Sequence, residues 1–145
     1  MFYQFLYKLV KSKMYSLYFD GASKHNPGQA ACGAVLYDDN DMEVDYDSKY
    51  LGDKVSNNYA EYTGLIVGLH LVLRNDVKQL KIYGDSLLVI NQMSTVWKVK
   101  NDTLIKLYED ANKLIKCLDK IKFIHIKRDK NKRADELANK KLKMI

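Results

Sequence analysis

The first third of the chain alternates short apolar segments with polar turns, a pattern typical of consecutive strands. Residues 15–20 (YSLYFD) are rich in aromatic side chains and predict a strand, and an Asn-Pro-Gly turn signal comes next at 26–28. Residues 31–37 predict a second strand, and residues 42–50, after an acidic turn, predict a third. Three consecutive strands joined by turns predict an antiparallel meander.

The pattern then changes to helical spacing. Residues 58–74 carry apolar side chains on more than one side, with Gly64 and Gly68 permitting close packing, and predict a largely buried helix. The other expected elements are a strand at 80–84, a short helix at 86–93, a helix capped by Asn101 or Asp102, a strand at 121–126 and a helix at 134–142. The chain is therefore predicted to be α/β, with a mixed five-stranded sheet. An antiparallel meander would be continued by parallel crossover strands, with helices packed on it.

One domain accounts for the whole pattern. At 145 residues the chain has the length of a single domain, and no internal repeat or Ser/Gly/Pro-rich linker divides it. Because Met14 stands just before the first strand, we expect residues 1–13 to be an N-terminal extension of unknown role and residues 14–145 to be the folded domain.

The apolar segments and the cysteines indicate in which cellular compartment the protein is expected. No apolar run approaches the roughly 18 residues that span a bilayer, and the N-terminal extension lacks Arg and a small-residue cleavage site. Cys32 and Cys117 form no paired or clustered cysteine motif, which argues against a disulfide framework or a zinc site and fits a reducing compartment. We therefore expect a cytoplasmic or otherwise intracellular monomer with no membrane association and no obligate protein partner.

The charge favours a polyanionic partner without identifying one. The chain has 24 Lys and Arg residues against 18 Asp and Glu residues, a net charge of +6 and a pI near 9.1. Such an excess bears on association and solubility only, so a basic protein without a nucleic-acid partner is equally compatible with it.

Four acidic residues stand at predicted boundaries between elements. Asp20 ends the first strand, Asp85 comes directly after the strand at 80–84, and Glu61 and Asp135 fall in the first turns of two helices. If the two strands are neighbours, their backbones lie about 4.8 Å apart and the two carboxylates can converge. Any one of these acids alone is more simply a turn former or a favourable charge at a helix N-terminus.

Converging carboxylates would require a cation. They repel one another and would destabilise the fold unless cations lay between them. Oxygen donors without Cys or paired His indicate Mg²⁺ or Mn²⁺. Two such ions about 4 Å apart can stabilise the attacking and leaving oxygens of an in-line phosphoryl displacement.

Four blocks of sequence carry a resemblance that covers residues 15 to about 143. They are FDGASKHNPG at 19–28, NNYAEY at 57–62, YGDS at 83–86 and NKRADELAN at 131–139. In order, spacing and flanking residues they resemble the type 1 ribonucleases H. The resemblance implies a ribonuclease H-like fold, with residues 14–145 as the catalytic domain. It also implies an endoribonuclease that hydrolyses the RNA strand of RNA–DNA hybrids.

The resemblance gives roles to the four acids. Asp20, Glu61, Asp85 and Asp135 match the family's catalytic, metal-binding carboxylates, which implies two Mg²⁺ ions, or Mn²⁺ in their place, with Asp20 bridging both. The nucleophile would be a metal-activated water, and the products would carry 5′-phosphate and 3′-hydroxyl ends.

Six further residues match positions that bind the substrate in that family. Residues 21–23 and the paired asparagines would line the minor groove, where 2′-hydroxyl contacts and A-like shape distinguish RNA without reading its sequence. The asparagines could instead cap the helix that begins beside them, and the glycine could serve a turn. The six are Gly21, Ala22, Ser23, Asn26, Asn57 and Asn58.

The chain departs from the longer members of the family. TVWKVKN at 95–101 leaves little room for their Lys- and Trp-rich protrusion, so this is a short form, and His25 and Leu87 replace residues more common at their positions. Many relatives also carry a helper His on a loop before the last carboxylate. His125 matches it by counting but lies in a strand pattern that predicts a partly buried side chain. We therefore favour a shortened loop on which Arg128 approaches the site, with His125 as the alternative.

Other functions compete with this interpretation. They are another enzyme of the same superfold, such as a junction resolvase or a reverse-transcriptase fragment, an inactive nucleic-acid-binding relative, and a basic structural protein. The blocks at 57–62 and 131–139 favour a ribonuclease H over the other enzymes. All four carboxylates are present, which argues against an inactive relative, and a structural protein would leave the four-block match unexplained.

Overall fold

The computed structural model describes Tyr3 and residues 13–144. In chain order its elements are β1 (Met14–Ser23), β2 (Gly28–Tyr37), β3 (Glu43–Val55), α2 (Asn57–Arg74), β4 (Gln79–Gly84), α3 (Leu87–Met93), α4 (Asp102–Ile115), β5 (Lys120–His125), a 3₁₀ turn η1 (Arg128–Lys130) and α5 (Lys132–Lys143). Apart from η1, the strands and helices of the described residues occur in the order that the sequence predicts.

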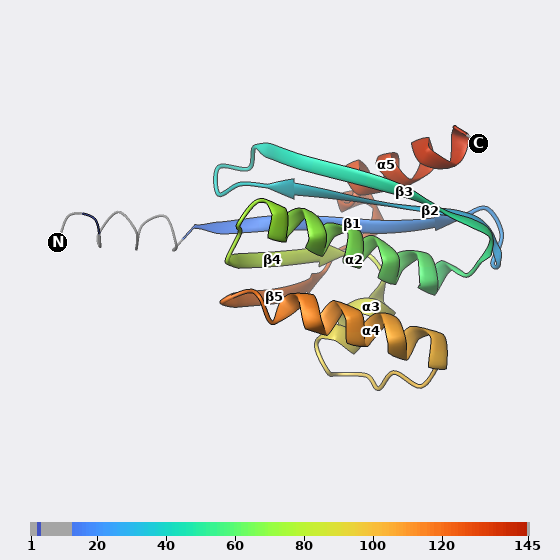
Figure 1. Ribbon diagram of the computed structural model, residues 1–145. Coiled ribbons are helices and arrows are strands. Elements are labelled where there is room, and N and C mark those ends of the chain that lie inside the picture. The colour runs from blue at the N-terminus through green and yellow to red at the C-terminus, as the bar shows by residue number, and fades with distance from the viewer. Residues whose placement is uncertain (1–2, 4–12, 145) are drawn as a thin grey trace.

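The strands form one mixed sheet in the order β3-β2-β1-β4-β5 (Figure 1). β1 pairs antiparallel with β2, and β2 with β3, as expected for strands joined by turns. β1 pairs parallel with β4, and β4 with β5, after crossovers through helices. The predicted mixed five-stranded sheet is confirmed for the described part of the chain, and β1 lies at its centre.

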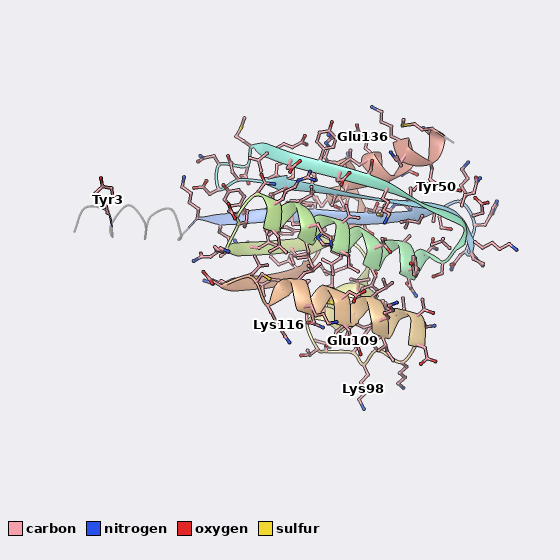
Figure 2. All side chains as sticks on the ribbon, in the orientation of Figure 1. Tyr3, Tyr50, Lys98, Glu109, Lys116 and Glu136 are labelled. Carbon is pink, nitrogen blue, oxygen red and sulfur yellow. The ribbon has the colours of Figure 1, made fainter. Side chains whose placement is uncertain are left out.

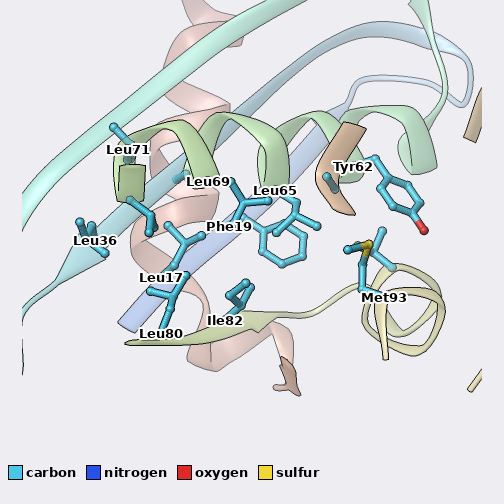
Figure 3. Close-up of a cluster of buried hydrophobic side chains, with 14 of the residues drawn as sticks. Leu17, Phe19, Leu36, Tyr62, Leu65, Leu69, Leu71, Leu80, Ile82 and Met93 are labelled. Atoms are coloured by element: carbon cyan, nitrogen blue, oxygen red, sulfur yellow. The ribbon is translucent and has the colours of Figure 1, made fainter. Parts of the chain in front are cut away.

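Helices cover both faces of the sheet. Figure 1 shows α2 and α4 in front of the strands and α5 behind them. The main core lies under α2, where Leu17 and Phe19 of β1 are fully buried against Leu65 and Leu69 of α2 and Ile82 of β4 (Figure 3). Burying a side chain of this size contributes about 1.5–3 kcal/mol, so the central strand is held firmly beneath this helix.

Three strands run further than the sequence pattern predicts, and β2 does so by beginning at Gly28 instead of at residue 31. β1 continues to Ser23 because residues 21–23 pair with residues 30–32 of β2. Asp20 therefore lies inside the strand and not at its end, which corrects the expected boundary. β3 continues to Val55, with register irregularities along its pairing with β2.

The helix starts also differ in detail. The N-cap of α2 is Ser56, whose hydroxyl accepts a hydrogen bond from the Tyr59 amide at 3.2 Å, so neither Asn57 nor Asn58 is the cap. Glu61 consequently lies in the second turn of α2, and the expectation of a first-turn position is wrong.

The extension expected at 1–13 lies outside the described residues except for Tyr3 and Lys13. Among the described residues, no helix combines the length and the apolar character needed to cross a membrane.

Candidate active site

Three of the four predicted carboxylates converge at one end of the sheet. Asp20 comes from β1, Glu61 from α2 and Asp85 from the residue after β4, and one carboxylate oxygen of each lies within 4.8 Å of the others. Asp20 and Asp85 are neighbours because β1 and β4 are parallel with Phe19 opposite Gly84, so each acid comes directly after a paired position.

A glycine in α2 brings Glu61 to the strand. A Cβ built at Gly64 would lie 2.6 Å from the Asp20 carbonyl oxygen, closer than real Cβ atoms come. Only a residue without a side chain therefore lets the helix approach the backbone of β1 at Asp20. The expected close packing at Gly64 thus has a specific purpose, which is to place Glu61 beside Asp20.

Bringing Asp20, Glu61 and Asp85 together without a cation costs electrostatic free energy. The Asp20 side chain is buried, with a residue exposure of 3%, and burial together with the charge of Asp85 raises its pKa to about 8. Burial and the charge of Asp20 raise the pKa of Glu61 well above its usual value. Glu61 Oε2 is buried and has no hydrogen-bond partner among the described residues.

This donor set fits a divalent cation. An unpartnered buried carboxylate oxygen beside two further carboxylates needs either protons or a cation to balance its charge. Oxygen donors without thiolate or imidazole are those that Mg²⁺ and Mn²⁺ prefer. The acidic cluster could therefore bind a divalent metal ion.

Asp135 lies beside this group but is not one of its three members. It is in the first turn of α5, and its neighbouring carboxylate raises the pKa of Asp20 further. Asn139, one turn later, donates a hydrogen bond of 2.9 Å to Asp135 Oδ1, and Arg128 Nη2 lies 3.9 Å from the same oxygen. Asp135 is thus held at the edge of the carboxylate cluster by one amide and faced by one guanidinium.

A cavity of about 430 Å³ opens over the carboxylates. Its lining comes from β1, the start of α2, the segment after β4, and α5. The lining residues are Asp20, Gly21, Ala22, Ser23, Lys24, Asn57, Asn58, Glu61, Asp85, Ser86, Arg128, Asn139 and Leu142. Five of the six expected substrate-binding residues are therefore brought to the carboxylates.

The sixth, Asn26, lies outside the lining but is tied to it. Its Oδ1 accepts a hydrogen bond of 3.1 Å from the Asn57 amide, which links the turn after β1 to the start of α2. Ser23 reinforces the link by donating to the Val55 carbonyl oxygen at 3.1 Å. These bonds position the two segments that carry the expected substrate residues.

Arg128 and His125 both lie near the site. Arg128 lines the cavity with 81% of its side chain exposed, on the short η1 turn after β5. His125 is exposed as the last residue of β5, and its Nε2 lies 3.2 Å from the Asp85 carbonyl oxygen. The expectation of a partly buried His125 is therefore wrong, because the strand ends at this residue and leaves its ring uncovered.

The sequence pattern did not single out Asn131 and Asn139 as site residues. Asn131 donates hydrogen bonds of 2.9 Å to Asp85 Oδ2 and to the Phe19 carbonyl oxygen, and Asn139 contacts Asp135. Both belong to the block at 131–139 that carries the family resemblance, and that block was the signal that could have found them. It could not reveal which carboxylate each asparagine contacts.

Known proteins match most of this chain. A family model described as reverse transcriptase-like matches residues 18–141. A bifunctional protein of Mycobacterium tuberculosis is 40% identical over 120 residues, which cover 83% of this chain and 33% of that protein. The chain thus spans about a third of the length of this curated relative.

Two solved structures match this chain over nearly their whole length. The crystal structure of RNase H1 from the halophilic archaeon Halobacterium salinarum superposes with a TM-score of 0.87 at 33% identity, covering 91% of this chain and 99% of that one. LC11-RNase H1 in complex with an RNA/DNA hybrid superposes with a TM-score of 0.81 at 34% identity, covering 87% of this chain and 94% of that one. The predicted fold is therefore shared with these two proteins.

Proposed function

Since the chain belongs to the reverse transcriptase-like family and, within it, to the type 1 ribonucleases H, we propose that it is an endoribonuclease that hydrolyses the RNA strand of RNA–DNA hybrids. The observation that carries the proposal is the convergence of Asp20, Glu61 and Asp85, with ligand oxygens within 4.8 Å of one another. The hybrid bound to the structural neighbour LC11-RNase H1 supports the choice of substrate.

Asp20, Glu61, Asp85 and Asp135 would hold two Mg²⁺ ions, with Mn²⁺ as an alternative. The buried, unpartnered Glu61 Oε2 and the raised pKa of Asp20 support a positively charged occupant of this cluster. When bound, such ions would stabilise charge on the phosphate as Lewis acids and lower the pKa of an attacking water. A new bond from the water oxygen to phosphorus would form while the bond from phosphorus to the 3′ oxygen breaks, which would leave 5′-phosphate and 3′-hydroxyl ends. The protein's own part is to hold Asp20, Glu61 and Asp85 close together with Asp135 beside them, and the bound cations would keep these carboxylates ionised.

The cavity lining would select the RNA strand. Residues 21–23 from β1 and Asn57 and Asn58 from α2 face the same cavity as the carboxylates. Their backbone groups, hydroxyl and amides can contact 2′-hydroxyls and the minor groove, which recognises RNA by shape. Asn26 would act by orienting Asn57, and Arg128 would approach the product phosphate from the η1 turn.

We further propose that residues 14–145 form the catalytic domain and that it acts as a monomer. β1 begins at Met14, and α5 brings Asp135 to the carboxylates. The described elements thus supply every proposed catalytic side chain from one copy of the chain.

Cleavage of three matched duplexes tests the function. A hybrid, a duplex RNA and a duplex DNA of one sequence are incubated with the protein in Mg²⁺ or in EDTA, with each strand labelled separately. We expect cleavage of the RNA strand of the hybrid in Mg²⁺ only, with 5′-phosphates on the products. Cleavage of duplex DNA at a similar rate, or no cleavage of the hybrid, would contradict the proposal.

A further inference from the structure

Asn131 is buried between strand β1 and the Asp85 carboxylate. It is 1% exposed and lies between η1 and α5, directly before the helix that carries Asp135. Its Nδ2 donates one hydrogen bond of 2.9 Å to the Phe19 carbonyl oxygen and another of 2.9 Å to Asp85 Oδ2. One amide group therefore joins the backbone next to Asp20 to the side chain of Asp85.

The ordinary task of a residue at this position is different. Asn131 is the N-cap residue of α5, and an N-cap side chain normally accepts a hydrogen bond from a backbone N–H of the first turn. Ser56, Ser86 and Asn101 do so at the starts of α2, α3 and α4. Asn131 makes no such bond. Its side chain is directed to Asp85, at the expense of the helix cap.

The acceptor end of the same amide is left unused. Asn131 Oδ1 is buried without a hydrogen-bond partner among the described residues. A buried polar atom without a hydrogen-bond partner lowers stability. If this position served stability alone, we would expect either a partner for this oxygen or a residue without it. The two hydrogen bonds that Asn131 donates are therefore its contribution to the site.

We propose that Asn131 is a positioning residue that holds the Asp85 carboxylate toward Asp20 and Glu61 before a metal ion binds. The proposal rests on the proposed function, because it assigns Asp85 to the metal-binding cluster. Charge repulsion from Asp20 and Glu61 favours turning Asp85 away from the cluster. A neutral amide donor opposes that movement and, unlike a Lys or Arg, brings no positive charge that would compete with the cation.

Two substitutions separate this role from packing. Asn131→Ala removes the donor and leaves a cavity, whereas Asn131→Leu removes the donor and keeps a side chain with the same number of heavy atoms, branched at the same carbon. Asn101→Ala is the matched control, because Asn101 is an N-cap asparagine that does cap its helix, at the start of α4. Amide NMR spectra of each labelled protein are recorded during titration with MgCl₂, and melting temperatures are measured in EDTA.

We expect both Asn131 variants to bind Mg²⁺ about 10- to 100-fold more weakly than the unmodified protein, the usual effect of losing a group that orients a metal ligand. Asn101→Ala should lower the melting temperature and leave Mg²⁺ affinity unchanged. The Mg²⁺ concentration that gives half-maximal hybrid cleavage should rise in the Asn131 variants only.

Two results would overturn the proposal. One is a folded Asn131 variant whose Mg²⁺ affinity stays close to that of the unmodified protein. The other is loss of folding in both variants, which would assign Asn131 to stability. Failure of the proposed function is distinguishable, since the unmodified protein would then leave the hybrid intact while its Mg²⁺ binding still depended on Asn131.

Discussion

Gly21 and Glu61 are in direct backbone contact. A Cβ built at Gly21 would lie 2.4 Å from the Glu61 amide nitrogen and 2.4 Å from the Ala60 carbonyl carbon. β1 and α2 therefore meet main chain to main chain at the residue after Asp20. This approach sets Asp20 and Glu61 side by side, and it depends on glycine at both position 21 and position 64.

Replacing Gly21 by Ala should separate the strand from the helix. The added methyl group meets backbone atoms, which cannot rotate away, so we expect a loss of about 1–3 kcal/mol in the free energy of unfolding, as for other overpacked sites. Hybrid cleavage should fall as well, because Glu61 moves with the helix. Urea unfolding and cleavage assays check both effects. A variant with the stability and activity of the unmodified protein would show that the contact does not constrain the site.

The metal-free protein should lose stability as the pH rises. The pKa of Asp20 is about 8 in the folded protein, against an ordinary value of 3.8. Between these values the folded protein binds more protons than the unfolded chain, so the free energy of unfolding decreases with increasing pH. The stabilisation that comes from protonated Asp20 is fully present below about pH 4 and is lost as the pH rises through about 8.

Melting in EDTA across that range measures the effect. We expect the melting temperature to fall toward alkaline pH, with a smaller fall in Asp20→Asn, which cannot ionise at this position. Mg²⁺ should restore most of the loss at the alkaline end, because a cation replaces the protons. An equal pH dependence in the two proteins would contradict the assignment of the shift to Asp20.

Arg128 should contribute more to turnover than His125. Arg128 Nη2 lies 3.9 Å from Asp135 Oδ1, and its side chain lines the cavity, whereas His125 Nε2 contacts the Asp85 backbone. We expect Arg128→Ala to lower the turnover rate several-fold and His125→Ala to lower it less. Since both side chains are exposed, neither variant should melt much earlier. A severe loss of turnover in His125→Ala at an unchanged melting temperature would reverse the two roles.

Lys24 is the best candidate for a phosphate contact at the cavity. It is exposed and lines the cavity beside the expected substrate residues. Lys24→Gln should therefore reduce the log–log salt dependence of hybrid binding by about 0.9, the contribution of one phosphate contact on a duplex. Lys116, at the far end of α4, is the control, and Lys116→Gln should leave the slope unchanged (Figure 2).

Arg133, in the first turn of α5, is a basic residue that is not available for a phosphate contact, because it is paired within the protein. Arg133 Nε lies 2.8 Å from Glu43 Oε1, and its guanidinium stands over the Tyr46 ring at 5.2 Å from the centroid. These contacts fasten α5 to the edge strand β3. Arg133→Ala should lower stability with no effect on the salt dependence of hybrid binding. An equal reduction of that dependence in Arg133→Ala and Lys24→Gln would contradict the assignment of Lys24 to phosphate binding and Arg133 to stability.

Local sequence sufficed for the order of strands and helices because strand and helix periodicities alternate clearly along the chain. It misplaced the end of β1, because residues 21–23 extend the strand only through pairing with residues 30–32 of β2. That pairing is a tertiary contact without a local pattern. The same holds for His125, whose exposure depends on where β5 ends and on the path of the chain beyond that strand.

Some features of the candidate site could likewise be predicted from the sequence, and others could not. The carboxylates could be predicted because each lies in a block with a specific order and spacing. The hydrogen bonds that hold Asp85 in place could not be predicted. Asn131 is 46 residues from Asp85 and 112 residues from Phe19 in sequence, although it donates hydrogen bonds to both. Its position just before a helix also predicts an N-cap, and only the fold shows that its side chain serves Asp85.

The most direct test of the proposed function is the rate of hybrid cleavage by Asp20→Asn and Asp85→Asn at a fixed Mg²⁺ concentration. An amide is nearly isosteric with a carboxylate but is a poorer metal ligand, so both variants should stay folded and lose RNA-strand cleavage. Asp20→Asn should also melt higher than the unmodified protein in EDTA, because it removes a carboxyl group that folding must either protonate or bury as a charge beside Asp85 and Glu61. Near-normal cleavage by either folded variant would contradict the claim that this carboxylate cluster carries the reaction.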